Sequence, residues 1–177
     1  MQLSSLPIPG VHLIEPTAYA DERGFFARLW DPAVLSAHGL NPRLAHCSLS
    51  FNRERHTLRG LHYQAPPFAE AKLVGCVRGA VFDVVVDLRR DSPTYCQSVT
   101  AELTAANRRF LYIPEGCAHG FQTLAPESEV IYFISAAYVP DAARGVRWDD
   151  PAFRIAWPPA SARIMSERDR SYPDFVP

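Results

Sequence analysis

The sequence has no excess of charge, no long apolar run and no closely spaced cysteines. Its 177 residues carry 18 Lys and Arg against 19 Asp and Glu, which leaves a net charge of −1. A basic field attracts the phosphates of nucleic acids, so this balance argues against a nucleic-acid-binding protein. No stretch approaches the ~20 apolar residues of a membrane helix, and the N-terminus lacks the basic and apolar regions of a signal peptide. We expect a cytoplasmic protein that does not bind membranes.

The cysteines and the composition favour one domain in a reducing compartment. The four cysteines show no C-x-x-C spacing; they are Cys47, Cys76, Cys96 and Cys117. In a chain of this length they are typical of free thiols rather than of a disulfide framework. Hydrophobic residues make up 47% of the chain, which is enough for a sizeable core, so residues 1–177 are interpreted as a single domain.

Short strands separated by proline and glycine dominate the pattern. Sixteen prolines and nine glycines leave little room for long helices. Residues 81–88 (VFDVVVDL) alternate with a period of two and are rich in β-branched side chains, which predicts a strand. Residues 109–114 and 129–139 have the same character. Many short strands with few helices indicate an all-β sandwich or barrel.

Two segments depart from this strand pattern. Residues 31–40 (DPAVLSAHGL) predict a helix, with Asp31 as its N-cap, Pro32 in its first turn and Gly39 at its end. The segment from about residue 148 onward is rich in proline, and we expect it to be irregular and to pack across the barrel.

Four segments combine polar side chains with glycine or proline in a way that a plain core does not need. They are DERGFF (21–26), TLRGLHYQ (57–64), KLVGCVRG (72–79) and PEGCAHGF (114–121). Together they offer Arg23, Arg59, His62, His119 and Lys72. Tyr132 and Tyr138 have the same parity on the predicted strand that follows, so both can face one cavity.

With VDLRRDSPT (86–94) and the tail from RWDDP to SERDR, these segments occur in the order and spacing of one known family. The chain resembles the dTDP-4-dehydrorhamnose 3,5-epimerases, cupin-fold enzymes that act on nucleotide-linked 4-keto-6-deoxy sugars. The resemblance covers most of the chain and implies an all-β double-stranded β-helix, a cupin or jelly-roll barrel with a few short helices. It also implies a reaction without metal or cofactor, and a homodimer in which the neighbouring chain contributes strand or active-site residues.

The resemblance assigns a role to each candidate residue. Epimerisation beside a ketone needs a base, an acid on the opposite face and a donor at the enolate oxygen. By the resemblance, His62 is the base, Asp169 orients it, Lys72 stabilises the enolate and Tyr132 is the acid. Substrate binding falls on Arg23, Phe26, Arg59, His119, Tyr138 and His46, and the two arginines hold the diphosphate through their forked donors. The expected reaction inverts C3, C5 or both in dTDP-4-dehydro-6-deoxy-D-glucose, giving dTDP-4-dehydro-L-rhamnose when both invert.

Each of these residues also has a plain structural interpretation. His62 and Tyr132 can be ordinary strand residues, Lys72 can be a surface charge, and the arginines can pair with nearby acids. Asp169 lies among other charges, as on a solvated face. Taken alone, His46 and His56 are typical of loop histidines, and Arg78, Asp83 and Asp87 are typical of packing, turn and barrel hydrogen bonds.

The chain differs from the family pattern in three ways. Arg28 stands where the family usually has a glutamate, His46 and Ser48 replace two amides, and Phe133 replaces a lysine. The first two differences are expected near the nucleotide base, where an exchange of donors and acceptors can redirect specificity. Thymidine diphosphate is the expected nucleotide, and a CDP-sugar stays open.

Three other functions stay open. A metal-dependent cupin is suggested by PEGCAH, half of a cupin metal motif, but GLHYQ offers one histidine where such sites use H-x-H and a glutamate. A 3-only or 5-only epimerase, or a keto-isomerase, would use the same base and the same enolate-stabilising groups. The third is a non-catalytic sugar-binding module, although binding alone does not need a proton-transfer pair.

Overall fold

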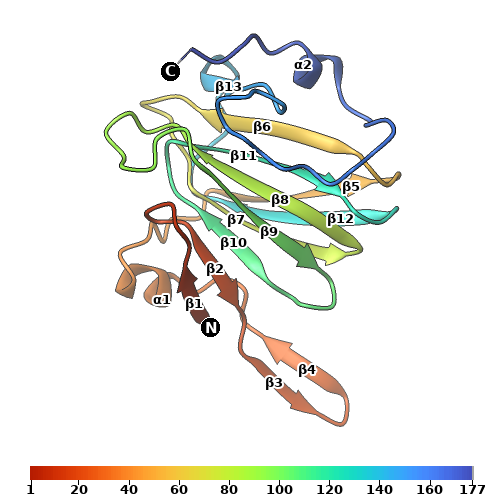
Figure 1. Ribbon diagram of the computed structural model, residues 1–177. Coiled ribbons are helices and arrows are strands. Elements are labelled where there is room, and N and C mark those ends of the chain that lie inside the picture. Colours follow the sequence, from red (N-terminus) through yellow and green to blue (C-terminus); the bar gives the residue numbers. More distant parts are fainter. Residues whose placement is uncertain (177) are drawn as a thin grey trace.

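The computed structural model describes residues 1–176, and two β-sheets dominate them (Figure 1). The first sheet has the order β1-β2-β10-β7-β12-β5, formed by β1 (Gln2–Ser5), β2 (His12–Glu15), β10 (Phe110–Ile113), β7 (Lys72–Arg78), β12 (Ser128–Ile134) and β5 (His46–Asn52). The second has the order β13-β6-β11-β8-β9, formed by β13 (Ala143–Gly145), β6 (Leu58–Gln64), β11 (Cys117–Thr123), β8 (Ala80–Asp87) and β9 (Ser98–Thr104). Neighbouring strands of both sheets pair antiparallel.

The two sheets enclose an apolar core. Val74 of β7 and Val130 of β12 pack in one buried cluster with Val85 of β8 and Phe121 of β11. Most strands that are neighbours in a sheet are distant in the sequence, so the chain crosses repeatedly between the two sheets. This arrangement is a double-stranded β-helix, and it confirms the predicted all-β jelly-roll fold class.

The strand predicted at residues 81–88 is β8, and both of its faces are covered. Val81 and Val85 pack in the core between the sheets, while Val84 and Val86 pack in a second cluster that includes residues of the C-terminal tail. A strand that is buried on both faces needs apolar side chains at successive positions, which explains the VFDVVVDL run.

The buried turn after β8 explains the VDLRRDSPT segment. The side chain of Asp87 is fully buried, and its carboxylate accepts hydrogen bonds from Arg89, Ser92 and Thr94. Although burial opposes ionisation, these bonds lower the pKa of Asp87 to about 2. Asp87 therefore has the turn role that the sequence predicts.

The predicted helix and the third predicted strand both end earlier than expected. Helix α1 covers Pro32–Ala37, and its N-cap Asp31 accepts hydrogen bonds from two backbone N–H groups of the first turn, as predicted. Strand β12 ends before Ser135, which instead exchanges two hydrogen bonds with Ala71. The strand predicted for residues 135–139 was therefore wrong, because the chain turns there into the 3₁₀ helix Pro140–Ala142.

The C-terminal tail crosses over β6 (Figure 1). Ile164 forms a parallel bridge with Thr57 immediately before β6. The short helix α2 (Glu167–Arg170) then begins after its N-cap Ser166, whose hydroxyl accepts a hydrogen bond from the N–H of Asp169. These contacts bring the SERDR segment close to the RGLH segment, more than 100 residues away in the sequence.

The hairpin of β3 (Ala18–Asp21) and β4 (Gly24–Ala27) projects away from the barrel (Figure 1). It carries exposed aromatic side chains, with Tyr19 69% and Phe26 72% accessible. In the described part of the chain, no helix combines the length and the apolar character needed to span a bilayer.

Candidate active site

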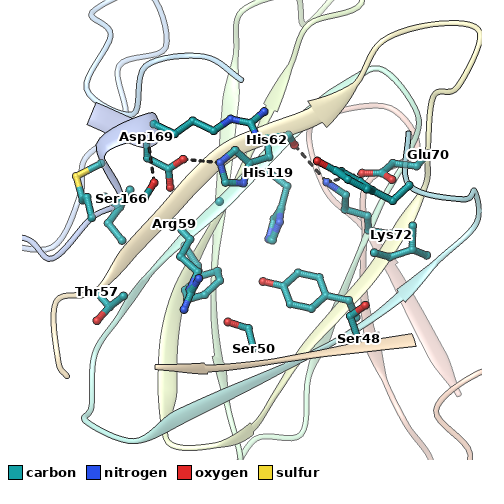
Figure 2. A pocket seen from close by; sticks show the side chains of 18 of the residues that line it. Ser48, Ser50, Thr57, Arg59, His62, Glu70, Lys72, His119, Ser166 and Asp169 are labelled. Carbon is teal, nitrogen blue, oxygen red and sulfur yellow. Dashed lines mark hydrogen bonds and ion pairs between the residues drawn. The ribbon is translucent and has the colours of Figure 1, made fainter. Parts of the chain in front are cut away.

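A cavity of about 660 Å³ opens between the two sheets, beneath the C-terminal tail. Strands β5, β7 and β12 of the first sheet and β6 and β11 of the second contribute to its wall. Its polar lining residues are His46, Ser48, Ser50, Thr57, Arg59, His62, Glu70, Lys72, His119, Tyr132, Tyr138, Ser166, Arg168 and Asp169. Eight of the ten residues predicted for catalysis or substrate binding therefore surround one space (Figure 2).

His62 and Asp169 form a hydrogen-bonded pair in this wall. Nε2 of His62 lies 2.7 Å from Oδ1 of Asp169, and the N–H of Gly60 donates to the other carboxylate oxygen at 3.1 Å (Figure 2). The Asp169 side chain is 5% exposed, whereas the His62 side chain is 41% exposed. The carboxylate is thus fixed from two sides, while the imidazole it holds remains accessible from the cavity.

The pair depends on two glycines where β6 and β11 pack closely. Gly60 has a φ of +119°, and a Cβ placed there would lie 2.6 Å from the Cα of Gly120. A Cβ at Gly120 would lie 2.5 Å from the carbonyl oxygen of Arg59. Only glycine permits both this backbone conformation and this approach, which explains the glycine of the R-G-L-H motif.

The environment of Asp169 keeps its carboxylate ionised. Burial opposes ionisation, but hydrogen bonding and charge interaction with His62, together with the Gly60 N–H, lower the pKa of Asp169 below its usual value. An ionised carboxylate accepts hydrogen bonds and cannot donate them, so the Nε2 of His62 carries the proton in this bond. The other ring nitrogen, Nδ1, is then left free to accept a proton.

Beside His62, a second histidine–carboxylate pair lies deeper in the barrel. His119 is the cross-strand partner of His62, and its Nε2 lies 2.9 Å from both carboxylate oxygens of Asp83. Asp83 is fully buried, which raises its pKa, while His119 and Lys72 oppose that rise. Asp83 thus makes a barrel hydrogen bond, as predicted, and this bond also fixes a histidine of the cavity wall.

Lys72 and Tyr132 come from the sheet that faces the two histidines. Lys72 is 8% exposed, and its ammonium donates to the carbonyl oxygen of His62 at 3.2 Å. The Tyr132 ring meets that of His119 edge-on, with 6.0 Å between the ring centroids. Burial and the charge of Asp83 raise the pKa of Tyr132, so its phenol keeps its proton at neutral pH.

The substrate-binding candidates divide into two groups. Arg59 lies in the wall, where Nε donates to Oδ1 of Asn52 at 2.7 Å and Nη2 donates to the carbonyl oxygen of Phe51 at 3.3 Å. His46 begins β5 and lines the cavity, so its interpretation as a loop histidine was wrong. Tyr138 also lines the cavity, although β12 ends at Ile134 and Tyr138 is not on the strand that was predicted to carry it.

Arg23 and Phe26 form the other group, because the hairpin places them outside this cavity. The Arg23 side chain is 84% exposed and pairs with Asp21 of the same hairpin. Within one chain, therefore, the structure does not bring these two residues to the other candidates. Arg28, one of the departures from the family pattern, forms an ion pair with Asp31 at the start of α1.

Several residues in the cavity wall, and Asp83 behind it, were not recognised as site residues from the sequence. Glu70 lies in the cavity because it precedes Lys72 by two residues, and side chains at this spacing share a face of an extended chain. Asp83 could have been recognised as an acid inside an apolar strand, since a buried carboxylate requires a partner. Ser166 and Arg168 reach the wall through the tail, and no local pattern predicts that docking.

Within residues 1–176, no three or more His, Cys, Asp and Glu side chains are grouped so that they could hold a metal ion. His62 and His119 are neighbours on adjacent strands, but each of them is hydrogen-bonded to its own carboxylate, Asp169 or Asp83.

Known proteins resemble this chain along nearly its whole length. The family model described as dTDP-4-dehydrorhamnose 3,5-epimerase matches residues 5–176. A dTDP-4-dehydrorhamnose 3,5-epimerase of Sinorhizobium fredii is 42% identical over 175 residues, covering 99% of this chain and 90% of that protein. The crystal structure of the Bacillus anthracis dTDP-4-dehydrorhamnose 3,5-epimerase, with TDP and PPi bound, has a TM-score of 0.93 and 38% identity, covering 98% of this chain and 99% of that one. ChmJ, a 3′-monoepimerase of Streptomyces bikiniensis in complex with dTDP-quinovose, has a TM-score of 0.88 and 32% identity, covering 96% and 85%.

Proposed function

This chain belongs to the dTDP-4-dehydrorhamnose 3,5-epimerase family, and on that premise we propose that it epimerises a dTDP-linked 4-keto-6-deoxyhexose by proton transfer through an enolate. The observation that carries the proposal is the 2.7 Å contact between His62 and the buried Asp169 at the wall of the cavity. The proposed substrate is dTDP-4-dehydro-6-deoxy-D-glucose. Inversion at C3 and C5 would give dTDP-4-dehydro-L-rhamnose.

In the proposed first step, Nδ1 of His62 removes a proton from a carbon next to the C4 ketone. The electrons of the C–H bond form a carbon–carbon double bond, and the ketone oxygen becomes an enolate oxygen. The ammonium of Lys72 donates a hydrogen bond to that oxygen, where the negative charge develops. Asp169 favours this step because it stabilises the imidazolium that forms.

In the second step, the phenol of Tyr132 gives a proton to the same carbon from the opposite face. The enolate returns to the ketone, and the carbon is inverted. Turnover ends when His62 releases its proton and Tyr132 regains one through solvent. The raised pKa of Tyr132 supports this role, because the phenol is present in its acid form at neutral pH.

Arg59 is proposed to bind the diphosphate, and His119 and Tyr138 to contact the sugar. A thymidine nucleotide is favoured by the relatives solved with TDP or dTDP-quinovose. A CDP-sugar is the alternative suggested by His46 and Ser48, both of which line the cavity. Binding of dTDP and CDP by calorimetry separates the two, and tighter binding of CDP would reject thymidine.

A second candidate is an epimerase that inverts one centre. It is favoured by the likeness to ChmJ, whose description as a 3′-monoepimerase shows that this fold also serves single inversion. Incubation with the dTDP-4-keto sugar in deuterated water separates the candidates by NMR. Label at both C3 and C5 supports the double epimerase, label at one of them supports the single epimerase, and no label rejects both.

We also propose that the protein is a homodimer in which each hairpin serves the cavity of the partner. The support is the exposure of Arg23 and Phe26 on a ribbon that projects from its own barrel, because exposed aromatic patches commonly mark interfaces.

The four free cysteines support a cytoplasmic location, where thiols stay reduced.

Mixing two inactive variants tests the shared cavity. R23A and H62A homodimers should each be impaired, but a mixed dimer would contain one cavity with both native residues. Recovery of activity after mixing and subunit exchange supports the proposal. A monomer in light scattering, or mixtures that are never more active than the separate variants, would contradict it.

A further inference from the structure

The proposed mechanism leaves one acidic side chain of the cavity without a role. A carboxylate oxygen of Glu70 lies 3.0 Å from Nζ of Lys72, and the two side chains are only 10% and 9% exposed. Both residues line the cavity, and Figure 2 shows them together, away from Asp169 and Ser166. An acid so close to the proposed enolate donor affects the ammonium that would bind the substrate.

The backbone that carries this pair is held in place by hydrogen bonds. Glu70 and Lys72 flank Ala71, whose N–H donates to Oγ of Ser135 at 2.8 Å and whose carbonyl oxygen accepts from the N–H of Ser135 at 3.0 Å. Lys72 then enters β7 and pairs with a neighbouring strand on each side. The main chain that carries both side chains is therefore held by Ser135 and by two neighbouring strands.

The ammonium of Lys72 has two contacts within the protein and is also open to the cavity. A lysine ammonium has three N–H donors. One is directed to the carbonyl oxygen of His62 at 3.2 Å, and the ammonium also forms an ion pair with Glu70, whose carboxylate oxygen lies 3.0 Å from Nζ. The ion pair with Glu70 therefore restrains the position of the ammonium rather than the direction of one particular N–H. Lys72 lines the cavity, so an N–H that does not bond to His62 is available to an oxygen bound there.

We propose that Glu70 is a positioning residue for Lys72, and that it holds the ammonium where an N–H can reach the ketone oxygen of the substrate. This inference rests on the enolate-stabilising role proposed for Lys72. The carboxylate also compensates the burial of the ammonium, since a buried charge without a partner is unfavourable. Glu70 acts only through Lys72 and does not itself contact the reacting atoms.

A double-mutant cycle tests this role, with deuterium uptake into the dTDP-4-keto sugar as the measured rate. The variants are E70A, E70Q, K72A and E70A/K72A. We expect E70A to lower kcat by about 10-fold with little change in KM, because an ordered charge-assisted contact is lost. E70Q keeps an acceptor oxygen at the same reach and should recover part of that loss. In the K72A background, E70A should change the rate by less than about 2-fold.

The control is E127Q, which changes a 57% exposed glutamate that pairs with Arg78 far from this strand end, and it should match the wild type. An equal loss on adding E70A to the wild type and to K72A would overturn the inference, as would an effect on KM alone. If K72A is as active as the wild type, the proposed role of Lys72 is what fails. If K72A loses activity while E70A does not, only the role of Glu70 fails.

Discussion

Replacing Asp169 with asparagine tests how His62 is held. The Gly60 N–H donates to one carboxylate oxygen and His62 lies at the other, so an amide in this place must present its oxygen to Gly60. Its NH₂ group would then face Nε2 of His62 and donate to it. The imidazole would carry its proton on Nδ1, which is the nitrogen proposed as the base, and the wrong tautomer would be stabilised.

The size of the effect follows from the bond that is lost. A hydrogen bond to a charged group contributes about 1.5–3 kcal/mol, which corresponds to roughly 10- to 160-fold in rate. The His62 side chain is 41% exposed. Water therefore screens the pair, and the expected loss of kcat is about 10- to 100-fold, smaller than the loss on removing the imidazole itself.

The assay is deuterium uptake by the keto sugar under saturating substrate, together with calorimetric binding of dTDP. D169N should lower kcat and leave nucleotide binding unchanged. D174N is the matched control, since it makes the same chemical change in the same tail, at an 80% exposed carboxylate that pairs with Arg147. A D169N rate within about twofold of the wild type, or a change in KM alone, would refute the orienting role of Asp169.

Three further predictions concern the acid, the fold of the site and the response to pH. Y132F should lower product formation by about 10²–10⁴-fold. It should still exchange label with retained configuration, because His62 can return a proton to the face from which it took one. Equal loss of exchange and of inversion in NMR would contradict this prediction. G60A should lower the free energy of unfolding by about 2 kcal/mol or more, because its Cβ would lie 2.6 Å from the Gly120 backbone; an unchanged urea midpoint would show that the backbone can yield there. The pKa of Asp87 falls from 3.8 to about 2 on folding, so its stabilising effect is complete above the unfolded value and is lost as the pH drops through the folded value. Between about pH 5 and about pH 2, the wild type should lose about 2 kcal/mol more unfolding free energy than D87N, and parallel urea curves for the two proteins across this range would contradict the assignment.

The features predicted well from the sequence are those with a local physical cause. Strand β8 follows from its β-branched residues, and the start of α1 follows from an aspartate N-cap with proline in the first turn. The contact between His62 and Asp169 was predicted only through the family resemblance. A periodic sequence pattern describes one element at a time, so it cannot predict a contact between a strand and a helix more than 100 residues apart.

What the sequence did not reveal depends on tertiary packing. The end of β12 was missed because residues 136–139 remain apolar, whereas the hydrogen bonds between Ser135 and Ala71 mark the place where the strand ends. Asp83 was interpreted by its strand alone, and its partner His119 belongs to another strand. The position of Arg23 on an exposed hairpin was equally unpredictable, because a motif gives residue types and not the place of each element in the fold.

The most direct test of the central claim is the rate of solvent deuterium uptake at C3 and C5 of dTDP-4-dehydro-6-deoxy-D-glucose by the wild type and H62A. If His62 is the base, the wild type should label the sugar, and H62A should do so about 10²–10⁴-fold more slowly while still binding dTDP. Uptake by H62A at the wild-type rate would contradict the account.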